Sequence, residues 1–258
     1  FGTAFRITTF GESHGGGLGV VVDGCPAGHP FPFARVAAQM ARRRPGQGKL
    51  TSPRQEADEV KVLSGLEPGT DLTLGTPITM LVGNSDARSH HYDDLAELYR
   101  PSHADYTYDA RYGLRAVAGG GRSSARETVG RVAAGALAED LLFALHAVEI
   151  VAWVAEVAHI VAPLPDLATL TRDQVDASPV RCPDPAAAEA MIAAIDDARR
   201  TGDTVGGVIR CVARKVPPET AERLRFALAA FGAWRTVLAA TSAGPSRPDI
   251  AVKPTMSA

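Results

Sequence analysis

The sequence predicts a layered α/β fold. Segments that alternate between apolar and polar residues, or that are short and β-branched, occur along most of the chain, as expected for strands. Alanine-rich segments with helical periodicity separate them. Because strands outnumber clean strand–helix–strand units, we expect sheets covered by helices, an α+β sandwich, and not a Rossmann fold.

Six segments have the composition of strands. Residues 5–10 and 59–63 alternate between apolar and polar side chains, the pattern of a half-buried strand. Residues 18–23 and 78–82 are short apolar runs, typical of a buried strand. The last two segments, residues 148–161 and 205–216, are rich in β-branched residues. Residues 148–161 are long enough for two strands.

Three segments have the composition of helices. Residues 33–44 are followed by a Pro-Gly pair, which stops a helix. Residues 124–145 form the longest run and are rich in alanine. Residues 185–200 place alanine, methionine and isoleucine along one side, so this helix is expected to pack on a core.

The chain has 258 residues, of which 22% are charged, and its net charge is −2. No linker divides it, so we expect a single domain over residues 1–258. The charge balance argues against a general nucleic-acid binder. Arginines gather in the first half of the chain, which favours a small acidic ligand. For the three arginines at 42–44, the alternative interpretation is the solvated end of a helix.

The three cysteines are Cys25, Cys182 and Cys211. They are widely spaced and odd in number, which indicates reduced thiols in a cytoplasmic protein. No cluster has the spacing of metal ligands, so no metal site is predicted. No apolar run reaches the length of a membrane span, so no membrane association is predicted.

The most informative segment is residues 119–126, with the sequence GGGRSSAR, directly before the alanine-rich helix. A glycine loop at a helix N-terminus presents free N–H groups to an anion. Arg122 and Arg126 add charge that suits a phosphate or a carboxylate. The alternative is a glycine-rich turn at a solvated helix start, but two arginines and two serines in the same loop favour an anion site.

Two of the seven histidines have a context that suits chemistry. His14 follows Glu12 and Ser13 in a glycine-rich loop, and His103 lies between Arg100 and Asp105. Histidine in such a loop can act as a general acid near neutral pH. On local chemistry alone, a structural hydrogen-bonding role is equally well supported for both, and it is the preferred interpretation for the other five.

A series of ordered motifs resembles the chorismate synthase family. The resemblance is nearly continuous from residue 1 to about residue 218, and a last block, VKPT, follows at residues 252–255. Because many blocks occur in the same order as in the family, the resemblance is far more specific than a single glycine motif would be. The principal blocks are TTFGESHG at 8–15, VDGCP at 22–26, RRRPG at 42–46, DEVKVLSG at 58–65, RPSHADYTY at 100–108, GGGRSSARET at 119–128 and RVAAGA at 131–136.

The resemblance implies an enzyme of the shikimate pathway. Members of the family convert 5-enolpyruvylshikimate 3-phosphate to chorismate by 1,4-elimination of phosphate, and they require reduced FMN. The resemblance also implies a cytoplasmic homotetramer, and it leaves open whether NADPH reduces the flavin on the enzyme. The substrate carries a phosphate and two carboxylates, which agrees with an arginine-lined pocket.

The resemblance also implies the roles of individual residues. His14 would protonate the leaving phosphate, and His103 would lie near the flavin, as the two catalytic residues. The residues expected to contact the flavin are Arg122, Ser123, Ser124, Lys253, Pro254, Thr255, Met256 and Ser257. Those expected to bind the substrate or its phosphate are Arg43, Lys49, Arg100 and Arg126.

The chain departs from the family pattern in sequence and in length. Lys49 stands where arginine is usual, and Ser102 where glycine is usual. Family members are longer, and the resemblance fades over residues 219–249. We therefore expect that loops after residue 218, and a C-terminal segment after residue 258 that supplies an aspartate near the flavin, are missing from this sequence. The alternative is a shortened, catalytically impaired homologue that only binds flavin or an acidic ligand.

Overall fold

A computed structural model describes residues 1–44, 57–84, 98–100, 103–218, 237–238 and 250–251. The chain divides into two compact units, Phe1–Leu141 and Leu142–Ala258. The single domain expected from the sequence stays a prediction.

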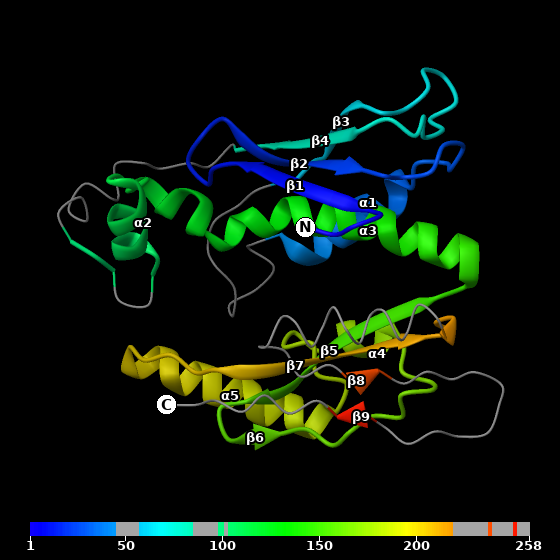
Figure 1. The fold of residues 1–258 in the computed structure, drawn as a ribbon. Helices are drawn as coiled ribbons and strands as arrows, with labels where there is room; N and C mark the ends of the chain where they lie inside the picture. Colours follow the sequence, from blue (N-terminus) through cyan, green and yellow to red (C-terminus); the bar gives the residue numbers. More distant parts are fainter. Residues whose placement is uncertain (45–56, 85–97, 101–102, 219–236, 239–249, 252–258) are drawn as a thin grey trace. The chain divides into compact units, whose positions relative to one another are not determined.

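An antiparallel four-stranded sheet forms one layer of the first unit, with helices along one of its faces (Figure 1). Its two central strands bury alternate side chains, among them Val20, Val22, Ile78 and Met80. This burial confirms the two apolar strands predicted from the sequence. The strand order is β1-β2-β4-β3, with the bounds β1 Arg6–Gly11, β2 Gly17–Asp23, β3 Lys61–Ser64 and β4 Ile78–Gly83.

Two helices pack on this sheet, α1 (Phe33–Arg43) and α3 (Thr128–His146). Their buried side chains, including Met40 and Leu137, join those of the sheet in one hydrophobic core. A Cβ at Gly130 of α3 would lie only 2.8 Å from a carbonyl oxygen of β2. The absence of a side chain there lets the helix backbone approach the sheet closely.

The long predicted helix begins later than expected. Regular α-helix starts at Thr128, and the residues before it form two 3₁₀ segments, η2 (Ala118–Ser123) and η3 (Ala125–Glu127). The reason is Ser124, whose backbone is extended (φ −69°, ψ 140°) and whose side chain caps η3, so the regular helix cannot begin there. A further helix, α2 (Asp105–Tyr112), was not predicted, because it buries only Asp105 and has no apolar stripe.

The second unit contains a three-stranded antiparallel sheet, with α5 (Pro185–Thr201) and the short α4 (Arg172–Asp176) contacting its central strand. Trp153, Val175 and Val212 lie at the centre of its core. The sheet order is β6-β5-β7, with the bounds β5 Glu149–Val157, β6 Ile160–Val161 and β7 Gly207–Arg214, and a separate pair joins β8 (Val237–Leu238) to β9 (Ile250–Ala251).

Every strand pairing in the described part of the chain is antiparallel. A Rossmann fold requires parallel strands, so the prediction of a layered α/β fold of another type is confirmed. None of the described helices has both the length and the hydropathy to cross a bilayer.

Candidate active site around the glycine triplet

The glycine triplet brings the two predicted catalytic histidines together in the first unit. Gly119 and Gly120 have φ angles of 61° and 74°, in the left-handed region that side chains disfavour. A Cβ at Gly119 would lie 1.9 Å from Nδ1 of His14, and one at Gly120 would lie 2.3 Å from Cε1 of His103. Each imidazole therefore occupies the space that a missing side chain leaves.

Ser13 anchors His14 to the triplet. Its side chain is fully buried, and its hydroxyl donates to the carbonyl oxygen of Gly119 at 3.2 Å. Nδ1 of His14 lies 3.1 Å from the same hydroxyl oxygen. This contact occupies Nδ1, so Nε2 is the nitrogen turned to other partners.

Asp105 anchors His103. The buried carboxylate of Asp105 forms a bidentate ion pair with Arg100, with 2.7 Å from both Nε and Nη2 of the guanidinium. Oδ1 also lies 3.0 Å from Nδ1 of His103. The hydrogen bonds from Arg100 hold the pKa of the Asp105 carboxyl far below its usual range, so this group is a carboxylate at neutral pH.

A second buried carboxylate, Asp58, joins two of the predicted anion-binding arginines. Nη1 of Arg43 donates to Oδ2 at 2.9 Å, and Nη1 of Arg126 donates to Oδ1 at 2.8 Å. The side chain of Arg126 is only 4% exposed. Both arginines are therefore part of the protein's own charge network, and their binding of substrate stays a prediction.

Asn84, at the end of β4, connects this network to the loop that carries His14. Its side-chain oxygen accepts from Nε of Arg126 at 2.8 Å. Its side-chain nitrogen donates to the carbonyl oxygens of Glu12 and Gly15, both at 2.8 Å. These two carbonyls flank Ser13 and His14, so the amide clamps the loop from both sides.

The serine–arginine part of the glycine motif is turned mainly toward the protein. Arg122 donates to Thr9 Oγ1 at 2.6 Å and to the carbonyl oxygen of Gly11 at 3.0 Å. Glu127 pairs with Arg122 at 3.2 Å and with Arg131 at 3.0 Å. The hydroxyl of Ser124 accepts from the backbone N–H of Arg126 and caps η3. The expected flavin contacts of Arg122, Ser123 and Ser124 stay predictions.

The structure thus gathers His14, His103, Arg100 and the glycine motif, and it places Arg43 and Arg126 on the neighbouring Asp58. Sequence reasoning gave no role to Asp58 or Asn84, whose positions follow only from folding. Asp105 had a signal, because it follows His103 by two residues. Lys49 and the second flavin segment, Lys253, Pro254, Thr255, Met256 and Ser257, lie outside the described residues.

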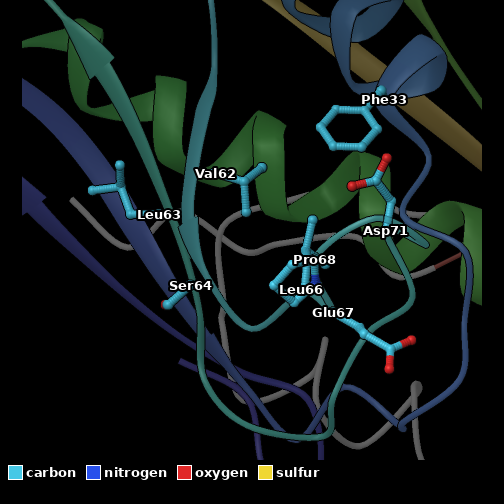
Figure 2. Close-up of a pocket in the computed structure, with 8 residues that line it drawn as sticks. All are labelled: Phe33, Val62, Leu63, Ser64, Leu66, Glu67, Pro68 and Asp71. Carbon is cyan, nitrogen blue, oxygen red and sulfur yellow. The ribbon is translucent and has the colours of Figure 1, made fainter.

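A separate pocket of about 250 Å³ lies beside β3 (Figure 2). Its walls are mixed polar and apolar, and the lining residues include Glu67 and Asp71. None of the predicted site residues lines it. Two carboxylates would repel an anionic ligand, so this pocket does not suit the acidic ligand that the arginines indicate. The full lining is Phe33, Val62, Leu63, Ser64, Leu66, Glu67, Pro68 and Asp71.

Fold and site together define a layered α/β protein with a glycine-loop site of two anchored histidines and several arginines. The family described as chorismate synthase matches residues 5–231. The chain belongs to the chorismate synthase family.

Individual relatives agree with this assignment. A chorismate synthase of Cyanothece sp. (strain PCC 7425 / ATCC 29141) is 55% identical over 217 residues, which are 84% of this chain and 59% of the relative. One of Akkermansia muciniphila is 54% identical over 219 residues, 84% of this chain and 60% of the relative. A solved structure titled "Crystal Structure of Chorismate Synthase" matches with a TM-score of 0.63 and 26% identity, over 83% of this chain and 60% of that chain. The chain therefore spans about 59% of the length of the first of these relatives.

Proposed function

We propose that this chain converts 5-enolpyruvylshikimate 3-phosphate to chorismate by 1,4-elimination of phosphate with reduced FMN. The observation that carries the proposal is the convergence of His14 and His103 on adjacent glycines of a motif shared with the family. Family membership supports the same reaction. A cytoplasmic homotetramer, and flavin reduction by NADPH, belong to the same proposal and rest on the resemblance alone.

His14 would act as the general acid for the leaving phosphate. Phosphate leaves poorly as a trianion, so a proton delivered to its oxygen lowers the barrier. Ser13 occupies Nδ1 of His14, so Nε2 is the nitrogen from which the proton would come. Asn84 and Ser13 hold the loop, and thereby fix the direction in which this nitrogen points.

The residues at the glycine motif are compatible with a phosphate-bearing cofactor. Arg122 and Arg131 bring two positive charges to the carboxylate of Glu127, and the carboxylate of Glu12 also lies beside the motif, at Gly121. Arg122, Ser123 and Ser124 would hold FMN there, and His103 would exchange a proton with the ring system from Nε2. Reduced FMN, when bound, supplies electron density for cleavage of the carbon–oxygen bond.

The test is an anaerobic turnover assay with photoreduced FMN and 5-enolpyruvylshikimate 3-phosphate, followed by chorismate absorbance. We expect turnover by the full chain, and a loss of about 10²–10⁴-fold for His14→Ala and for His103→Ala, the range that a general acid contributes. Flavin fluorescence should show that both variants still bind FMN. His159→Ala is the matched control, because His159 is exposed and belongs to the second unit.

The outcomes separate the two functions left open by the sequence. FMN or substrate binding without any turnover by the unmodified chain would support the impaired homologue instead. Full activity of His14→Ala would contradict its role as the acid. An equal loss in His159→Ala would show that the histidine substitutions act through folding.

A further inference from the structure

Asp105 lies at the first position of α2 and is buried, although its helix packs few other side chains. Its two oxygens face three hydrogen-bond donors of Arg100 and one nitrogen of His103. Oδ2 accepts from the backbone N–H and from Nε of Arg100, at 3.0 and 2.7 Å. Oδ1 accepts from Nη2 of Arg100 at 2.7 Å and lies 3.0 Å from Nδ1 of His103.

This arrangement fixes the hydrogen of the imidazole. An ionised carboxylate can only accept hydrogen bonds, and Arg100 holds Asp105 in that form. Nδ1 of His103 must therefore donate, and the neutral ring has its lone pair on Nε2. The ring edge that bears Nε2 lies against Gly120, where a Cβ would be 2.7 Å from this nitrogen.

We propose that Asp105 is a positioning residue that keeps the hydrogen of neutral His103 on Nδ1 and presents Nε2 at the glycine triplet. Arg100 contributes by fixing the orientation of the Asp105 carboxylate through its bidentate ion pair. The consequence for turnover rests on the proposed function, whereas the tautomer does not.

Asp105→Asn makes a sharp test of this arrangement. Two donors of Arg100, its backbone N–H and Nε, meet Oδ2, so the new amide keeps its carbonyl oxygen there. Its NH₂ group then takes the place of Oδ1, where it faces Nδ1 of His103 and the bond from Nη2 of Arg100 is lost. Nδ1 must then accept, and the hydrogen of the neutral ring moves to Nε2. The substitution changes few atoms yet inverts the tautomer.

The measurement is the ¹⁵N spectrum of the imidazole rings in the ¹⁵N-histidine-labelled full chain, at a pH where His103 is neutral. His103→Gln identifies the signals by their loss. We expect hydrogen on Nδ1 in the unmodified chain and on Nε2 in Asp105→Asn. Turnover of Asp105→Asn should fall by about 10²–10⁴-fold, the range for a positioned general acid or base.

Asp109→Asn is the matched control. Asp109 lies on the same helix and pairs with Arg115 at 2.9 Å, but it contacts no histidine among the described residues. Its substitution should leave both the tautomer of His103 and turnover unchanged.

Two spectral results would overturn the proposal: hydrogen on Nε2 in the unmodified folded chain, or an unchanged tautomer in Asp105→Asn. The first of these needs no variant, so it stands even if Asp105→Asn fails to fold. An inverted tautomer with unaltered turnover would refute the positioning role. If the unmodified chain has the expected tautomer but no activity, the proposed function fails and the tautomer assignment holds.

Discussion

Arg126 shows that a side chain predicted to bind a ligand can also hold the protein's own charges in place. It is buried, pairs with Asp58 at 2.8 Å and bonds to Asn84 at 2.8 Å. Removing one partner of a buried ion pair leaves the other charge poorly compensated. The stability of the first unit should therefore depend on Arg126, whether or not a ligand is bound.

We expect Arg126→Met to lower the free energy of unfolding by about 3 kcal/mol. This value is the lower end for a broken buried ion pair, and we choose it because Arg43 still pairs with Asp58 in the variant. Urea unfolding measures this change. Adding Asp58→Asn should recover part of the loss, since the double variant no longer buries the carboxylate. Unchanged unfolding with only a raised KM would mean that Arg126 serves the substrate alone.

Asn84 links a buried arginine to the loop that carries His14. A single amide accepts from Arg126 and donates to two carbonyls beside His14. The position of His14, which is predicted to be catalytic, thus depends on a residue far from it in sequence. Local motifs reveal the histidine but not the group that holds its loop.

At the scale of elements, the decisive feature is the irregular segment η2. It contains three consecutive glycines with positive φ, and two histidines fill the space beside the first two of them. The motif therefore acts by its backbone shape as well as by its charges.

Gly120→Ala should reduce turnover strongly, because a Cβ there would lie 2.3 Å from Cε1 of His103 and would force the ring away. The left-handed φ adds strain of about 1–3 kcal/mol. Turnover and urea unfolding, measured together, separate the two effects.

Gly135→Ala provides the contrast within α3, since nothing lies within 4 Å of its Cβ position. This substitution should raise stability by about 0.5–1 kcal/mol and leave turnover unchanged. A fully active Gly120→Ala would show that His103 does not need its observed place.

At the scale of the whole molecule, the chain has distinct cores in its two units. In the first unit, the core lies between the sheet and the helices α1 and α3. In the second unit, the core is built around Trp153. Units with separate cores can open independently. If the chain is the single domain expected from the sequence, a core substitution should destabilise both units. If the two units open independently, it should destabilise only its own unit.

We expect Val175→Ala, in the second core, to cost about 2 kcal/mol locally. Hydrogen exchange followed by mass spectrometry should show faster exchange in β5 and β7, with β2 and β4 unaffected. Equal acceleration in all four strands would instead support one cooperative domain.

The sequence by itself determined the strands, the main helices and the family. Strand alternation and helix end signals are local properties, so β2, β4 and α5 could be predicted from neighbouring residues. The ordered motifs identified the family that residues 5–231 match. The same motifs singled out His14 and His103 before any geometry was known.

Only the tertiary structure decided which side chains meet. Helix α2 lacks an apolar stripe, so periodicity could not predict it, and the extended backbone at Ser124 delayed the start of α3. The partners of Arg126, Asp58 and Asn84, come from segments distant in sequence. They meet Arg126 because its buried positive charge requires an opposite charge and hydrogen-bond acceptors. That need is met by folding and leaves no local pattern, which is why Asp58 and Asn84 emerged only from the structure.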